Sequence, residues 1–182
     1  LVTVLESDEQ IGLVGPVSNH VSSDCQLVKY NNENIDLFSA KQFEQHKFGT
    51  VATTRLVGFC LVTRRDKLEI VGCFDDRYLI GNFEDDDLGL RFMERGYKLC
   101  CAKGVFIYHY GGKSFEGEYK KTTNTEILNR NRKLYTEKWY NGRINNITKL
   151  QKPLQIRYLL ASDTPCGGVK IAFEHANRLK DR

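Results

Sequence analysis

The chain has 182 residues, of which 41% are hydrophobic, 11% aromatic and 27% charged. This is the composition of a globular protein, and with only 3 prolines and 15 glycines it excludes a collagen-like or Pro/Gly-rich disordered chain. No run approaches the ~18 consecutive apolar residues that indicate a membrane-spanning helix. The length predicts one domain and a fraction of a second.

The net charge of +4 is unevenly distributed along the chain. Residues 1–116 hold 13 Lys/Arg and 17 Asp/Glu, whereas residues 117–182 hold 14 Lys/Arg and 6 Asp/Glu. The basic C-terminal third could meet phosphate groups or a membrane surface, and the alternative is a solvated helix face with a basic linker. No dense basic cluster alternates with stacking aromatic residues, so no nucleic-acid partner is expected.

Hydrophobic patterning predicts an α/β fold. The chain opens on the end of an amphipathic helix, so we interpret its start as a cut within a longer protein. The predicted strands lie at 11–17, at 56–62 as a strand buried on both faces, and within 97–109. The predicted helices lie at 39–46 as a single turn, at 64–70, at 85–95 and at 125–140. A glycine follows each of the last two helices, as is typical of helix C-termini.

A second unit is predicted near the C-terminus. Residues 146–154 have the character of a linker, and a strand, a loop and a helix follow within 155–182. A single strand and helix cannot bury the edge of a sheet, so we interpret this segment as the first step of another domain.

The six cysteines, at positions 25, 60, 73, 100, 101 and 166, are predicted to be free thiols. Cys60, Cys73 and Cys100 stand in apolar runs, where a thiol behaves as a small hydrophobic group. No C-x-x-C pair occurs, so a structural zinc site is not expected. We therefore expect a reducing, cytoplasmic location.

The most unusual local feature is four consecutive carboxylates, Glu84 to Asp87, at the start of a predicted helix. One or two acidic residues there would be explained by the helix dipole. Four repel one another unless a cation, a partner or a raised pKa relieves the repulsion. A carboxylate with a raised pKa beside a cleft is what general-base catalysis requires. Function and helix capping both remain open at this point.

His109 ends a predicted strand and is followed by a glycine-rich turn at Gly111 and Gly112. Glycine allows a ligand or another segment to approach the backbone closely. A neutral imidazole at a strand end can bind a divalent cation. The alternative is a histidine with a structural role.

Six motifs follow one another in order: Gly15-Pro16-Val17-Ser18-Asn19, Val57-Gly58-Phe59-Cys60-Leu61-Val62-x-Arg64-Arg65, Val71-Gly72-x-Phe74-Asp75-Asp76-Arg77-Tyr78, Gly81-Asn82-Phe83-Glu84-Asp85-Asp86-Asp87-Leu88-x-Leu90-Arg91, Gly96-Tyr97-Lys98-Leu99 and His109-x-Gly111-x-x-Ser114-Phe115. In this order, over residues 1–145, the chain resembles family 2 glycosyltransferases with the GT-A fold. The resemblance implies transfer of a sugar from a nucleotide-sugar donor (a UDP-, GDP- or dTDP-sugar) to a glycan acceptor, as in polysaccharide or glycoconjugate synthesis.

The resemblance also implies roles for the acidic run. Asp85 would be the catalytic base that takes the acceptor proton in an inverting reaction, and Glu84 would support it or contact the acceptor. Asp86 and Asp87 would be helix-start residues or acceptor contacts.

The resemblance also implies roles for three residues outside the acidic run. Gly58 and Phe59 would line the donor-sugar and acceptor pocket, and His109 would help to hold the Mn²⁺ or Mg²⁺ ion that binds the leaving diphosphate. Enzymes of this fold bind the nucleotide through an N-terminal half that ends in an acidic metal motif, and nothing upstream of Ile11 supplies one. We therefore expect this chain to be the acceptor-side, C-terminal part of a GT-A domain and to be inactive alone.

The tail carries a second resemblance. The motif Ile156-Arg157-Tyr158-Leu159-Leu160-x-Ser162-Asp163-Thr164-x-x-Gly167-Gly168-Val169-Lys170 is similar to the opening of a family 4, GT-B glycosyltransferase. Gly167 and Gly168 would then form an anion or donor loop at a helix N-terminus, the alternative being a tight turn. The chain as a whole is expected to come from a tandem glycosyltransferase, with peripheral membrane association at the inner face. A non-catalytic module that binds or scaffolds the acceptor is the alternative function.

Overall fold

The computed structural model describes residues 1–79, 81–111 and 121–141. The chain divides into two compact units, residues 1–141 and 142–182. The second unit lies outside the described residues, and with it the predicted unit at 155–182, Cys166, Gly167 and Gly168. The following description concerns the first unit alone.

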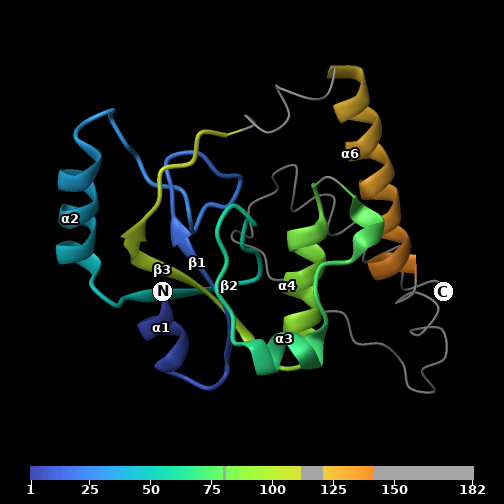
Figure 1. Ribbon diagram of the computed structural model, residues 1–182, viewed down its shortest axis with the longest axis horizontal. Helices are drawn as coiled ribbons and strands as arrows, with labels where there is room; N and C mark the ends of the chain where they lie inside the picture. The colour runs from blue at the N-terminus through green and yellow to red at the C-terminus, as the bar shows by residue number, and fades with distance from the viewer. Residues whose placement is uncertain (80, 112–120, 142–182) are drawn as a thin grey trace, which may run out of the picture. The chain divides into compact units, whose positions relative to one another are not determined.

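A three-stranded mixed sheet forms the centre of this unit (Figure 1). Its strands are β1 (Ile11–Val17), β2 (Thr50–Thr53) and β3 (Lys98–Phe106), in the order β1-β3-β2. The central strand β3 pairs in parallel with β1 and antiparallel with β2. All seven residues of β1 are buried, which explains why this strand is a continuous apolar run in the sequence. The α/β class is therefore confirmed.

Five α-helices accompany the sheet in the part of the chain that is described. They are α1 (Val2–Glu6), α2 (Ile35–His46), α3 (Arg65–Val71), α4 (Glu84–Glu94) and α6 (Lys121–Thr136). A 3₁₀ turn, η1 (Asp76–Tyr78), precedes α4, and a π-helical turn, η2 (Glu137–Asn141), follows α6. In Figure 1, α2 and α4 stand on opposite sides of the strands, and α6 lies beyond α4.

Local sequence explains where several of these elements begin and end. The Asn34 side chain accepts hydrogen bonds of 3.0 Å from the backbone N–H groups of Asp36 and Leu37, which extends α2 well upstream of the single turn predicted at 39–46. After α4, Gly96 adopts a left-handed φ of 83°, as the sequence predicts for a helix end. The predicted helices at 64–70 and 85–95 and the strand at 11–17 are confirmed within a residue.

The strand predicted at 56–62 is wrong. Only Val62 makes a β-bridge there, with Val14. The backbone N–H of Val57 instead donates to the Gln26 side chain at 2.7 Å, and that of Gly58 donates to Asp85 at 2.7 Å. Because these donors bind side chains rather than a neighbouring strand, the apolar run becomes an irregular segment, of which Leu56 alone is fully buried.

Two groups of buried side chains make up the core. The larger one, which includes Leu13, Leu56, Phe92 and Leu99, lies between the sheet and α4. The smaller one covers the other side of β1 and consists of Val4, Leu5, Ile11, Val14, Cys100 and Ala102. The five cysteines within the described residues are free thiols. No helix within 1–79, 81–111 or 121–141 is long and apolar enough to cross a membrane.

Candidate functional site

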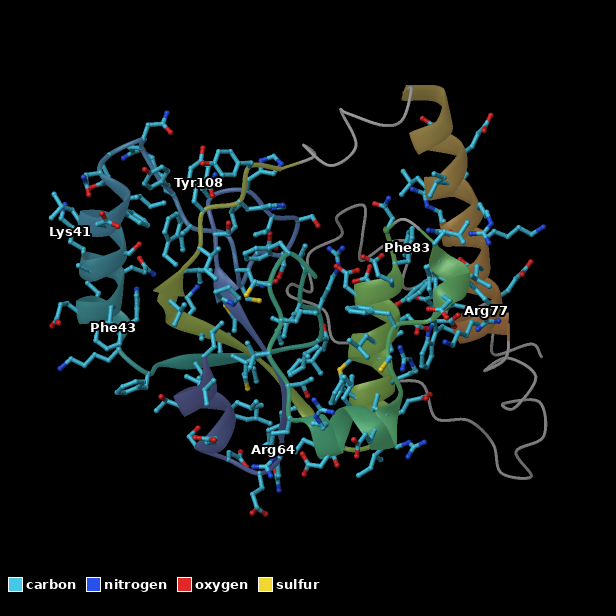
Figure 2. The ribbon with its side chains drawn as sticks, in the orientation of Figure 1. Lys41, Phe43, Arg64, Arg77, Phe83 and Tyr108 are labelled. Atoms are coloured by element: carbon cyan, nitrogen blue, oxygen red, sulfur yellow. The ribbon has the colours of Figure 1, made fainter. Side chains whose placement is uncertain are left out.

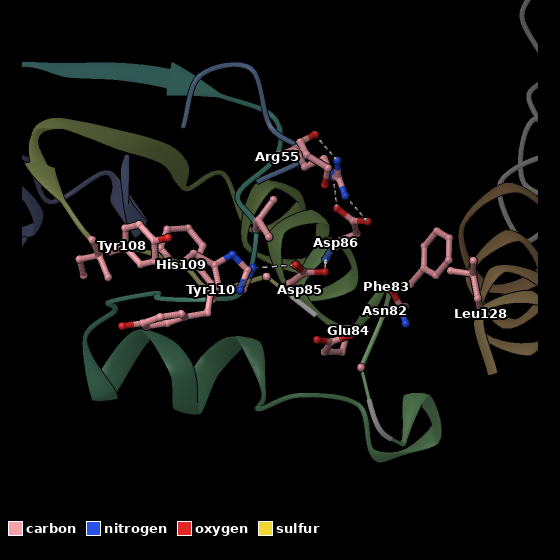
Figure 3. A pocket seen from close by; sticks show the side chains of 17 residues that line it. Arg55, Asn82, Phe83, Glu84, Asp85, Asp86, Tyr108, His109, Tyr110 and Leu128 are labelled. Atoms are coloured by element: carbon pink, nitrogen blue, oxygen red, sulfur yellow. Dashed lines mark hydrogen bonds and ion pairs between the residues drawn. The ribbon is translucent and has the colours of Figure 1, made fainter. Parts of the chain in front are cut away.

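A cavity of about 760 Å³ opens at the N-terminal end of α4 (Figure 3). Three segments that are distant in sequence line it: the irregular segment 55–59, the turn and helix start 81–86, and residues 107–111 after β3. In Figure 3 the carboxylates of Glu84 and Asp85 lie between the rings of residues 108–110 on one side and Phe83 and Leu128 on the other. The cavity thus combines carboxylates with aromatic rings.

Asp85 is the most strongly restrained carboxylate of the cavity wall. Its Oδ2 accepts a 2.7 Å hydrogen bond from the backbone N–H of Gly58, and its Oδ1 accepts one of 2.8 Å from the N–H of Asp86. Only 9% of the residue is exposed. Burial raises the pKa of Asp85, the Asp86 charge raises it further, and the Gly58 hydrogen bond opposes the rise. Asp85 is therefore an oriented carboxylate with an increased affinity for a proton.

Glu84 also lines the cavity, but one of its carboxylate oxygens lacks a hydrogen-bond partner. Its Oε2 is buried and has no hydrogen-bond partner. Burial raises the pKa of Glu84, and the neighbouring charges of Asp85 and Asp86 add to the rise. A buried, unpaired carboxylate oxygen costs free energy, so the position is unfavourable for stability alone.

Asp86 is paired at the rim of the cavity. Arg55 Nε donates to Asp86 Oδ1 at 2.6 Å, and a second guanidinium nitrogen of Arg55 donates to the Ser22 carbonyl at 2.9 Å. The hydrogen bond to Asp86 raises the pKa of the Arg55 guanidinium, which stays charged. Arg55 thus neutralises one of the four consecutive carboxylates, which relieves the repulsion around Asp85.

Asp87 lies in the first turn of α4, which fits the helix-start role, one of the two roles expected for it. Asp87 is fully buried and does not line the cavity. Its Oδ1 accepts from Trp139 Nε1 at 2.8 Å and pairs with Lys138 Nζ at 2.7 Å, and its Oδ2 pairs with Arg91 Nε at 2.9 Å. Successive residues of a helix point in different directions, so the fourth carboxylate turns away from the cavity into an ion-pair network.

His109 is held from several sides on the wall opposite α4. Its backbone N–H donates to Asn19 Oδ1 at 2.8 Å, and Asn19 Nδ2 donates to the His109 carbonyl at 3.2 Å. The ring stacks on Phe59, with centroids 5.1 Å apart and planes at 17°, and Nδ1 lies 2.7 Å from the carbonyl of His20. With Nδ1 engaged, Nε2 is the ring nitrogen left for a ligand or metal. Phe59 and His109, for which the sequence predicts separate roles, are therefore one stacked unit.

The Mn²⁺ or Mg²⁺ ion is expected in the intact enzyme, with its principal carboxylate supplied from outside this chain. Within the described residues no group of three or more His, Cys, Asp or Glu side chains is arranged to hold a metal ion. Divalent cations such as Mg²⁺ and Mn²⁺ require several oxygen or nitrogen ligands. His109 alone does not form such a site.

The sequence analysis assigned no role at the site to several residues that the structure brings to it. Arg55 and Asn19 reach the site through long-range contacts, and Asn131 of α6 contacts the turn that leads into α4. Asn131 is a polar residue among apolar ones in the predicted helix at 125–140, and this is the one signal that could have indicated a buried contact.

Comparison with known proteins gives no family for the chain: no family model, no curated protein and no solved structure matches it.

Proposed function

We propose that residues 1–141 form the acceptor-side part of a GT-A glycosyltransferase domain of the family 2 type. The complete protein would transfer a sugar from a nucleotide-sugar donor to a hydroxyl group of a glycan acceptor, with inversion at the anomeric carbon. The observation that carries this proposal is the state of Asp85, an oriented and nearly buried carboxylate with a raised pKa at the wall of a large cavity.

Asp85 would act as the general base. A carboxylate has about four lone-pair sites, and the two backbone hydrogen bonds to Asp85 occupy two of them. The acceptor hydroxyl would give its proton to a free site of Asp85 while its oxygen bonds to the anomeric carbon. The bond to the nucleoside diphosphate breaks, and its electron pair leaves with the diphosphate. General-base assistance of this kind contributes about 10²–10⁴-fold to rate.

The other groups at the cavity have supporting roles in this proposal. Arg55 would hold the Asp86 carboxylate so that the charge of Asp86 does not displace the acceptor. The stacked rings of Phe59 and His109 offer a flat face. Pyranose rings have apolar C–H faces that pack on aromatic side chains, which matches such a wall. Most ligands of the Mn²⁺ or Mg²⁺ ion and most residues of the nucleotide pocket would come from elsewhere in the complete protein.

The test is transfer by the protein that contains this chain, with a nucleotide-sugar and a glycan acceptor. We expect Asp85→Asn to lose about 10²–10⁴-fold in kcat while acceptor binding and folding persist. The matched control is Asp76→Asn, an exposed aspartate in η1, which should transfer at the parental rate. An Asp85→Asn protein as active as its parent would refute the base assignment. Acceptor binding without transfer by the unmodified protein would favour a non-catalytic binding module.

A further inference from the structure

The turn that leads into α4 has a backbone that is unfavourable for its residues. Leu79, Asn82 and Phe83 have φ values of 55°, 69° and 74°, in the left-handed region that side chains other than glycine avoid. Phe83 is also the N-cap residue of α4, and its side chain makes no capping hydrogen bond. Glycine and asparagine tolerate this region at positions 81 and 82, but leucine and phenylalanine do not favour it, so neither residue preference at Leu79 and Phe83 nor a helix cap explains why the turn holds its shape.

Asn131 of α6 supplies the missing restraint. Its Nδ2 has two N–H donors and lies within hydrogen-bond distance of three backbone carbonyls of the turn, those of Tyr78 at 2.7 Å, Gly81 at 2.8 Å and, by a shared hydrogen, Asn82 at 3.2 Å. The residue is fully buried. Because all three partners are acceptors, only the NH₂ side of the amide can face them.

The neighbouring contacts strengthen this connection between α6 and the turn. The Arg130 guanidinium donates to Asn131 Oδ1 at 2.8 Å and also to the Arg77 carbonyl at 2.8 Å. The ring of Phe83 packs against Tyr135 with centroids 5.3 Å apart, and Figure 2 shows Phe83 between α4 and α6. The turn is therefore held from α6 at both of its ends.

We infer that Asn131 is a positioning residue of the candidate site: by holding the turn at Tyr78, Gly81 and Asn82, it sets where Glu84 and Asp85 enter the cavity. The importance of Asn131 for catalysis rests on the proposed function, whereas the effect of Asn131 on the positions of the two carboxylates does not. Without the three hydrogen bonds, the turn would relax from its left-handed conformation and the first turn of α4 would shift with it.

The experiment follows the carboxyl ¹³C signals of Glu84 and Asp85 in the full chain as a function of pH. In Asn131→Ala, the relaxed turn should admit water to Glu84, so its titration midpoint should fall toward the ordinary value for glutamate. The matched control is Asn129→Ala, which removes an exposed asparagine of the same helix and should leave both midpoints unchanged. A residue that only stabilised the fold would change the unfolding transition without moving these midpoints.

Unchanged midpoints for both carboxyl groups in a folded Asn131→Ala chain would overturn the inference. Should Asn131→Ala fail to fold, Asn131→Ser keeps one donor beside the carbonyls and should show a smaller shift in the same direction, and no shift there would overturn it equally. Failure of the proposed function is seen separately, because full transfer activity in Asp85→Asn would refute the base while leaving the titration result for Asn131 intact.

Discussion

The backbone N–H of Gly58 donates a 2.7 Å hydrogen bond to Asp85 Oδ2 across 27 positions of sequence. This contact joins the irregular segment before α3 to the start of α4. A Cβ atom on residue 58 would lie 2.9 Å from Asp85 Cβ and 3.3 Å from its Oδ2, so the approach leaves no room for a side chain. The glycine in the motif around residue 58 is thus explained by the position of one carboxylate.

Gly58→Ala should therefore displace Asp85. We expect a loss of about 1–3 kcal/mol in the free energy of unfolding, as for other substitutions that overfill a packed site. The Asp85 carboxyl titration should shift as well, because its strongest hydrogen bond is disturbed. Chemical denaturation and carboxyl NMR measure the two effects. Val57→Ala alters the same segment without adding an atom beside Asp85, and an equal shift in that variant would contradict the steric explanation.

Glu84→Gln should stabilise the chain at neutral pH. The pKa of Glu84 is raised by burial, so the folded state binds its proton more tightly than the unfolded state does. The ionised form is therefore unfavourable above the folded-state pKa, and this cost disappears as the pH falls through it. We expect a gain on the order of 1 kcal/mol near pH 7 that shrinks in acid. Thermal melts of Glu84→Gln and of the exposed control Glu44→Gln, recorded near pH 7 and in acid, show whether the gain in stability shrinks as the pH falls. A gain that grows in acid would contradict it.

Asp75→Asn should have the opposite pH dependence. Hydrogen bonds from Arg77 and Lys138 hold the pKa of Asp75 well below its usual range. Such a group stabilises the folded state above its unfolded-state pKa, and this contribution is lost as the pH falls through the folded-state value. The variant should lose about 1 kcal/mol near pH 7 and approach the parent in strong acid. Asp76→Asn, at the exposed neighbour, is the control for urea titrations, and it should match the parent throughout.

Asp87→Ala should be strongly destabilising and visible in fluorescence. It removes the buried partner of Arg91, Lys138 and Trp139, and breaking a buried ion pair costs about 3–5 kcal/mol. Trp139 is the single tryptophan of the chain and is only 6% exposed, so the tryptophan emission reports the surroundings of Asp87. A red shift should accompany the loss of stability. Asp66→Ala removes a carboxylate from an exposed pair with Arg64 and should change neither.

The sequence predicts those elements whose own pattern decides their structure. The apolar run at 11–17 and the amphipathic helix before Gly96 form as expected, because burial on two faces or on one face produces these patterns. The strand Thr50–Thr53 was missed because it lies at the edge of the sheet and its four residues are largely exposed. An edge strand of this kind has no apolar alternation to detect.

The candidate site divides in the same way. Glu84, Asp85 and Asp86 were found because consecutive carboxylates at a helix start are unusual, and they lie together at the cavity with Phe59 and His109. The resemblance left Asp87 as a helix-start residue or an acceptor contact, and the helix turns it toward Trp139 and away from the cavity. The role of Asn131 could not be predicted from the sequence, since its partners are carbonyl groups about 50 residues away.

The central claim is that the Asp85 carboxylate takes the proton of the acceptor hydroxyl. A base must be ionised to act, so transfer should fall as the pH is lowered through the pKa of Asp85, which burial raises. The most direct measurement compares, in the protein that contains this chain, the acidic limb of kcat against pH with the carboxyl ¹³C titration of Asp85. The account predicts that the two midpoints coincide. A transfer rate that stays constant while Asp85 becomes protonated would contradict it.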